Sequence, residues 1–146
     1  MKPETWGIVI GGAIPAFCFA LSSILQKVGT NAGIGLGPFL VATGLAIVAF
    51  GGVAWVFYPD RAVTVTGVWA SFSMGVAWAM GISCVTIGLS RFAVPLSKLV
   101  PLYNTNTLLA ILFSMVIFAE WQQVHALKLL AGAVLIIVGS ILAAGS

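Results

Sequence analysis

Long apolar stretches without a single charged residue constrain this chain more than any other feature. Residues 38–57 contain no Asp, Glu, Lys or Arg, and the 146 residues are 61% hydrophobic and only 6% charged. A soluble domain carries about 25% charged residues, so this chain could not cover a water-facing surface. Inside lipid the backbone N–H and C=O groups must hydrogen-bond to one another, which only helices or a closed barrel allow. The long apolar runs lack the alternation of apolar and polar residues that barrel strands show. The sequence therefore predicts an all-α integral membrane protein.

Five segments reach the length of about 20 residues that a helix needs to cross a hydrocarbon core about 30 Å thick. We expect a single transmembrane domain over residues 1–146, with spans at about 6–25, 38–57, 68–89, 93–118 and 127–144. Amphipathic aromatic residues fall at the predicted span ends, at Trp6, Trp55, Tyr58, Trp69 and Trp121. Such rings favour the headgroup level. The first apolar run is too long for a signal peptide, so we expect a multi-pass protein of the cell (inner or plasma) membrane.

The basic residues do not decide which way these spans are inserted. An odd number of spans places the two termini on opposite faces of the membrane. The basic residues then divide three against three, with Lys2, Arg61 and Lys128 on one side and Lys27, Arg91 and Lys98 on the other. The division is three against two if Lys98 stays inside the span. This balance leaves two alternatives, a single topology set by the first helix or insertion in both orientations. The basic residues are also too scattered for a nucleic-acid surface, so no nucleic acid is expected as a partner.

A cluster of polar side chains surrounds a proline near the start of the fourth predicted span. Pro101 removes one backbone hydrogen bond and is the predicted hinge or kink. Around it lie Lys98, Tyr103, Asn104 and Thr105. A broken helix with amide and hydroxyl groups near the midplane is a common substrate site in transporters. These four residues are therefore predicted to bind a small-molecule substrate.

Each candidate also has a structural interpretation, and both stay open. Lys98 starts roughly 7 Å inside the span at 1.5 Å per residue, so its stem could carry the ammonium back to the interface. Asn104, Thr105 and Thr107 could join neighbouring helices at about 0.6 kcal/mol per hydrogen bond. Trp78 of the third span either stacks on the substrate or packs against another helix.

Small residues recur at every fourth position along the third span, at Ser71, Gly75, Ala79 and Ser83. This spacing keeps them on one helical face, and small side chains allow a second backbone to approach closely. The stripe predicts tight helix packing, either within one protomer or between two.

The residues needed for other kinds of chemistry are missing from the predicted spans. None of the three acids, Glu4, Asp60 and Glu120, lies mid-span, which argues against a proton-coupled exporter of organic cations. We find no nucleophile–base pair, metal-ligand cluster or phosphate loop, and interpret Cys18 and Cys84 as small hydrophobic residues. We therefore expect no enzyme, no metal and no cofactor.

Three features occur together in the C-terminal half: VPLSKLVPLY containing Pro101, Glu120 nineteen residues later, and GAVLIIVG from Gly132 to Gly139. In these features the chain resembles the EamA-type repeat of the drug/metabolite transporter superfamily. Members of that superfamily usually have ten spans, formed by two repeats of opposite orientation, and this chain has the span count of one. The resemblance implies a half-size transporter of a small polar metabolite, sugar-like or amino-acid-like.

A half-size transporter completes its assembly by pairing with an inverted copy, which the balanced basic residues also favour. We expect an antiparallel, dual-topology homodimer in the lipid bilayer, working by alternating access around a site at the two-fold axis. Glu120 is expected to have a structural role at the membrane surface, capping a helix or pairing near Lys128 or Gln122. Two alternatives stay open: a non-transporting membrane subunit or assembly partner that uses the small-residue stripe, and one half of a heteromeric transporter.

Overall fold

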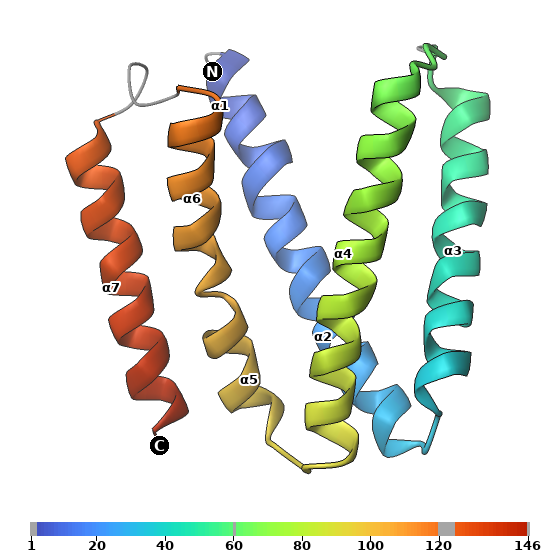
Figure 1. Cartoon of the computed structure of the whole chain (residues 1–146), viewed down its shortest axis with the longest axis vertical. Coiled ribbons are helices and arrows are strands. Elements are labelled where there is room, and N and C mark those ends of the chain that lie inside the picture. The colour runs from blue at the N-terminus through green and yellow to red at the C-terminus, as the bar shows by residue number, and fades with distance from the viewer. Residues whose placement is uncertain (1–2, 60, 120–124, 146) are drawn as a thin grey trace. The chain divides into compact units, whose positions relative to one another are not determined.

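The computed structural model describes residues 3–59, 61–119 and 125–145, and these residues form helices joined by short turns (Figure 1). Five helical stretches are long and apolar enough to cross a membrane: Trp6–Asn31, Leu36–Phe57, Val65–Ser90, Leu96–Ile117 and Leu127–Ala144. The prediction of an all-α fold with five membrane-spanning helices is confirmed at this level. The chain divides into two compact units, Met1–Ala93 (unit 1) and Val94–Ser146 (unit 2).

Unit 1 begins with one continuous helical run. It consists of α1 (Pro3–Ile8), the π-helical turn η1 (Val9–Ala13) and α2 (Ile14–Asn31). The sequence places the end of this span near Leu25, and the helix continues six residues further. It ends in a Schellman motif, in which the N–H of Gly33 bonds Thr30 O at 3.1 Å and the N–H of Ile34 bonds Gly29 O at 3.3 Å. Gly33 takes the positive φ of 84° that this motif requires.

Two further spans complete unit 1. Helix α3 (Leu36–Phe57) starts after the extended residue Gly35, and α4 (Val65–Ser90) starts after the extended residue Thr64. The Thr64 hydroxyl accepts a hydrogen bond from the N–H of Gly67 at 3.1 Å. This cap satisfies one of the unpaired N–H groups of the first turn, and α4 therefore begins three residues before the predicted start of the span.

The packing of unit 1 is concentrated at one end of its helices. Helix α4 packs against both α2 and α3, and Figure 1 shows α2 crossing α4 near the end where α2 turns into α3. The buried residues of α2 and α4 lie near that end, at Gln26, Thr30, Thr86 and Leu89. None of the described residues of α3 is buried. The apolar surface of these helices is therefore mostly available to lipid or to a partner.

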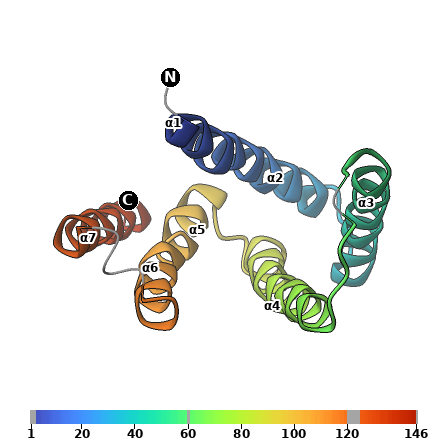
Figure 2. The same ribbon diagram turned by 90° about the horizontal axis from the view of Figure 1, so that it is seen from above.

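Unit 2 contains α5 (Leu96–Tyr103), α6 (Asn106–Ile117) and α7 (Ala126–Ala144). Both α5 and α6 pack against α7, which lies beside them in Figures 1 and 2. The contact buries Met115 of α6 together with Ala133 and Ser140 of α7. Small side chains on α7 therefore allow the helices of unit 2 to approach closely. The predicted fourth span thus consists of two helices.

Candidate functional site

The interruption between α5 and α6 lies where the sequence places its polar cluster. The N–H of Thr105 bonds Leu102 O at 3.2 Å, and the N–H of Leu108 bonds Thr105 O at 3.1 Å. These bonds reach back three residues, as in a 3₁₀ turn, and not the four of an α-helix. Asn104 and Thr105 keep right-handed backbone angles, with ψ of −9° and −14°. The span therefore tightens at this point without opening into a loop.

Pro101 lies inside α5, before the interruption. Because proline has no N–H, the carbonyl of Ser97 lacks its usual partner four residues along the helix. The carbonyl of Pro101 also lacks its usual bond, since the Thr105 N–H turns to Leu102. The helix ends at Tyr103, on the C-terminal side of the proline. The role of Pro101 as a hinge stays a prediction.

The predicted substrate-binding residues of this span differ in exposure within unit 2. Lys98, Tyr103 and Thr105 are half-buried, whereas Asn104 is exposed. The Thr105 hydroxyl donates to Leu102 O at 2.7 Å, so Leu102 O receives both the backbone and the side-chain proton of Thr105. That bond gives Thr105 a local structural role. Asn104 is the one of these four predicted residues that is exposed, so its carboxamide is open to a ligand.

The small-residue stripe lies along α4 in unit 1. Ser71 and Gly75 are exposed, while Ala79 and Ser83 are half-buried, and the Ser83 hydroxyl donates to Ala79 O at 2.6 Å. Apart from its chain neighbours and the backbone of its own helix, no described atom lies within 4 Å of where a Cβ on Gly75 would stand. The outer half of the stripe is therefore uncovered in unit 1, and its packing role stays a prediction.

An open groove of about 490 Å³ lies between α2, α3 and α4 of unit 1. This volume is within the range of small-molecule sites. Its polar lining consists of Ser22 and Gln26 from α2, Thr43 from α3 and the indole of Trp78 from α4, and most of the remaining lining is apolar. Among the described residues that line the groove, none is charged. Trp78, predicted from sequence as a substrate contact or a packing residue, is 43% exposed at this groove.

A buried polar contact joins α2 to α4 beside the groove. Gln26, which is 3% exposed, donates from Nε2 to Thr86 Oγ1 at 2.9 Å and to Ile82 O at 3.3 Å. Thr86, which is 2% exposed, donates its own hydroxyl proton to Ile82 O at 2.8 Å. Gln26 is not predicted from the sequence because the first expected span ends at about residue 25, one residue before it. The spacing of Ser22, Gln26 and Thr30 at every fourth position was the available signal for a polar helical face.

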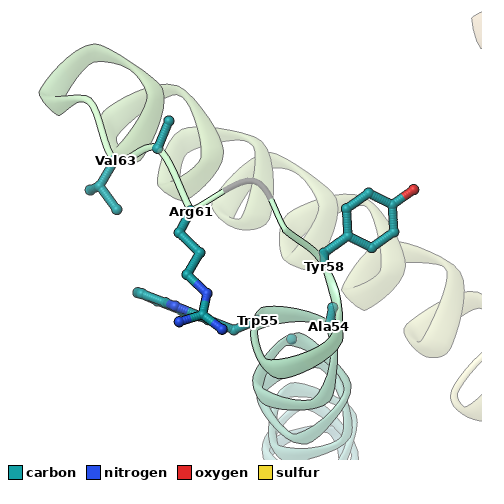
Figure 3. Close-up of a pocket in the computed structure, with 7 residues that line it drawn as sticks. Ala54, Trp55, Tyr58, Arg61 and Val63 are labelled. Atoms are coloured by element: carbon teal, nitrogen blue, oxygen red, sulfur yellow. The ribbon is translucent and has the colours of Figure 1, made fainter.

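A second, smaller hollow of about 270 Å³ lies at the turn between α3 and α4. Figure 3 shows the Arg61 side chain extending toward the indole of Trp55, with Tyr58 on the other side of the turn. Trp55 and Tyr58 are 62% and 70% exposed. Exposed aromatic rings beside a basic side chain at a span end are typical of anchoring at the lipid headgroups.

Several sequence expectations concern residues outside the described part of the chain. These are Lys2, Asp60, Glu120, Trp121 and Gln122. The role expected for Glu120 therefore stays a prediction. In the part of the chain that is described, no group of three or more His, Cys, Asp or Glu side chains is placed to hold a metal ion.

The fold defines a multi-pass, all-α membrane protein. No family model, no curated protein and no solved structure matches the chain.

Proposed function

We infer that this protein is a half-size transporter of a small polar metabolite in the cell membrane. Its similarity in sequence motifs to the EamA-type repeat supports this assignment to the drug/metabolite transporter superfamily. The observation that carries the proposal is the interruption at Asn104–Thr105 of a span that is long and apolar enough to cross a membrane. Asn104 lies about 12 Å along the span from Leu96 at 1.5 Å per residue. That depth is a little over a third of the way along a span of 22 residues, about 33 Å long, and so inside the span, where discontinuous helices commonly bind substrates.

The side chains of the interruption suit a substrate rich in hydroxyl or amide groups, such as a sugar or an amino acid. The exposed Asn104 carboxamide offers two N–H donors and one carbonyl acceptor. Thr105 and Tyr103 add hydroxyl groups, and the Lys98 ammonium supplies donors that could meet a carboxylate or a hydroxyl. We assign substrate binding to these four residues and the bending of the span to Pro101.

Two copies of opposite orientation would form the working transporter. Five spans match one of the two inverted repeats of the superfamily. With Lys98 in the site the remaining basic residues divide three against two, a small difference that permits insertion in both orientations. The exposed apolar surface of α3 is available for such a contact. Each bundle would then rock against the other around a fixed midplane site and open it alternately to the two sides of the membrane.

Transport into proteoliposomes tests the proposal directly. The full chain is reconstituted and uptake is measured for a panel of labelled sugars and amino acids. We expect Asn104→Leu to reduce uptake of the transported compound at least about tenfold, because a buried substrate group would lose its partner. Asn106→Leu is the matched control, because Asn106 is exposed on the first turn of α6 and is not assigned to the site. Equal loss in both variants, or no uptake of any compound, would contradict the proposal.

Topology reporters fused after Ser146 test the antiparallel assembly separately. A cytoplasm-active and a periplasm-active reporter should both give strong signals if the chain inserts in both orientations. Signal from one reporter alone would exclude the self-sufficient homodimer. It would favour the heteromeric half, which pairs with a different short chain of opposite orientation.

A non-transporting subunit is the second candidate, favoured by the uncovered part of the small-residue stripe. Ser71 and Gly75 are exposed in unit 1. An added Cβ on Gly75 would meet no described atom within 4 Å apart from its chain neighbours and the backbone of its own helix. Such a face permits close approach of a helix from a larger protein. Gly75→Leu would then abolish co-purification with that partner, whereas the transporter proposal predicts that Asn104→Leu abolishes uptake without loss of assembly.

A further inference from the structure

Apart from Trp78, for which a substrate contact is one of two predicted roles, no residue of the groove between α2, α3 and α4 has a role in the transport mechanism described above. Its lining follows helical periodicity, with Cys18, Ser22 and Gln26 on α2 and Trp78 and Ile82 on α4. Gln26 lies about 7 Å and Cys18 about 20 Å from the end of α2 at 1.5 Å per residue. The groove therefore extends from near one membrane surface to the interior of the bilayer.

The amide of Gln26 has a defined orientation beside this groove. Ile82 O can only accept a hydrogen bond and lies 3.3 Å from Nε2, so the nitrogen, and not the oxygen, must face α4. The Thr86 hydroxyl already donates to Ile82 O and accepts the second Nε2 proton. Among the described residues of unit 1, none donates a hydrogen bond to Gln26 Oε1. Among the described residues no fully buried side-chain oxygen or nitrogen lacks a partner, so Oε1 keeps some exposure although Gln26 as a whole is only 3% exposed. We infer that this exposure is toward the groove that Gln26 lines, where Oε1 is an acceptor for a bound molecule.

The remaining lining restricts what such a molecule can be. The described lining carries no charge, and a charged group in an apolar membrane site without a counter-charge is strongly disfavoured. Trp78 and Phe39 supply aromatic surface, which favours offset or edge contacts with another ring. Trp78 precedes Ile82 by one helical turn, about 6 Å along α4. One aromatic ring with an attached donor has the length to contact both Trp78 and Gln26.

We propose that this groove binds a small uncharged aromatic molecule that carries a hydroxyl or amide donor. The donor bonds Gln26 Oε1, the ring lies against Trp78, and the molecule enters from the bilayer through the open side of the groove. A lipid acyl chain fits the apolar walls but leaves Gln26 Oε1 unpaired, which distinguishes a ligand site from a lipid-filled gap. The proposal does not depend on transport, because it uses none of the residues of the span-four interruption.

Photolabelling of the full chain in lipid nanodiscs tests the site. The probe is 4-(3-trifluoromethyl-diazirin-3-yl)benzyl alcohol, an uncharged aromatic alcohol, and its methyl ether is the matched probe without a donor. We expect the alcohol to label the groove segments of α2, α3 and α4 saturably. We expect the ether to label them about three- to tenfold less, the range that one hydrogen bond supplies. The proposal would be overturned if labelling of the groove segments rises linearly with probe concentration and is equal to the labelling of the exposed residue Phe50, which lies outside the groove.

Two variants separate the acceptor from the packing of the helices. Gln26→Leu should reduce labelling by the alcohol to the level of the ether and leave labelling by the ether unchanged. Thr86→Val removes one bond between α2 and α4 but keeps Gln26 Oε1, so it should leave labelling by the alcohol unchanged. If both variants reduce labelling by the two probes equally, the effect is one of packing and the proposal fails.

A third pair of variants keeps the test decisive if Gln26→Leu does not fold. Ala46→Phe on α3 fills the groove with an apolar ring and should abolish saturable labelling at Trp78 and Ile82. Leu45→Phe adds a ring to the neighbouring residue, which is 65% exposed and does not line the groove, and should leave the labelling unchanged. Persistence of saturable labelling at these residues in Ala46→Phe would contradict the proposal. Failure of any of these labelling tests would leave the uptake assay of the Asn104 variants unaffected.

Discussion

Hydroxyl side chains donate to carbonyls of their own helix in both units, as Ser83 of α4 and Ser140 of α7 do, but in unit 1 the Gln26 side chain also bonds across to a second helix. In unit 1, Gln26 of α2 donates across to Thr86 and Ile82 of α4. In unit 2, the hydroxyls of Thr105 and Ser140 donate to carbonyls three or four residues earlier in their own spans. A bond across helices holds two spans together, whereas a bond within one helix only satisfies the side chain.

The difference extends to how the helices of each unit pack. The contact between α2 and α4 buries polar side chains, with Gln26 and Thr86 among its most buried residues. The contact of α5 and α6 with α7 includes Met115 and the small residue Ala133. Unit 1 should therefore be sensitive to the loss of hydrogen bonds, and unit 2 to a change in side-chain volume.

The largest expected effect is that of Ala133→Leu, which tests packing by volume in unit 2. Ala133 is 2% exposed, so three added carbon atoms would force α7 away from its neighbours. Overpacking of this kind costs about 1–3 kcal/mol of the free energy of unfolding. Thermal unfolding in detergent measures the loss, and Val134→Leu on the exposed neighbour, which is 52% exposed, is the control. A loss no greater in Ala133→Leu than in the control would contradict the described packing.

The next largest effect is that of Gln26→Ala in unit 1. The variant loses two hydrogen bonds to α4, each worth about 0.6 kcal/mol in membrane proteins, and leaves a small cavity. We expect the free energy of unfolding to fall by about 1–2 kcal/mol, measured by the same method. Ser22→Ala, one turn earlier on the same helix and exposed, should have little effect. Equal losses in the two variants would show that Gln26 does not join α2 to α4.

The sequence predicts the five helices well because lipid allows few other structures for long apolar runs. Residues 38–57 lie entirely within α3, which ends at the predicted residue Phe57. The turn after the first span is less well predicted. Gly29 and Asn31 are turn-forming in water, but both remain helical and the chain reverses only at Gly33. Propensity for a turn is thus weaker than the tendency of a membrane helix to continue.

The candidate sites were predicted only in part, because they depend on contacts between helices. The polar cluster after Pro101 coincides with the interruption at Asn104–Thr105. The partnership of Gln26 with Thr86 joins residues 60 positions apart, which local patterns cannot pair. Trp78 was identified as a candidate, but the groove that it lines requires three helices to be in place.

Thr105→Val in unit 2 should have the smallest effect. It tests most directly whether the side-chain bond in unit 2 stays within one span, in contrast to the bond of Gln26 in unit 1. The variant removes the hydroxyl that bonds Leu102 O, but the Thr105 N–H still bonds the same carbonyl at 3.2 Å. The free energy of unfolding should therefore fall by less than about 0.5 kcal/mol, below the average for bonds between membrane helices. Uptake of a transported compound should fall more clearly, because a substrate loses one hydroxyl partner in the interruption. If Thr105→Val instead destabilises the protein as strongly as Gln26→Ala, the Thr105 hydroxyl also joins helices, and the contrast between the two units is wrong.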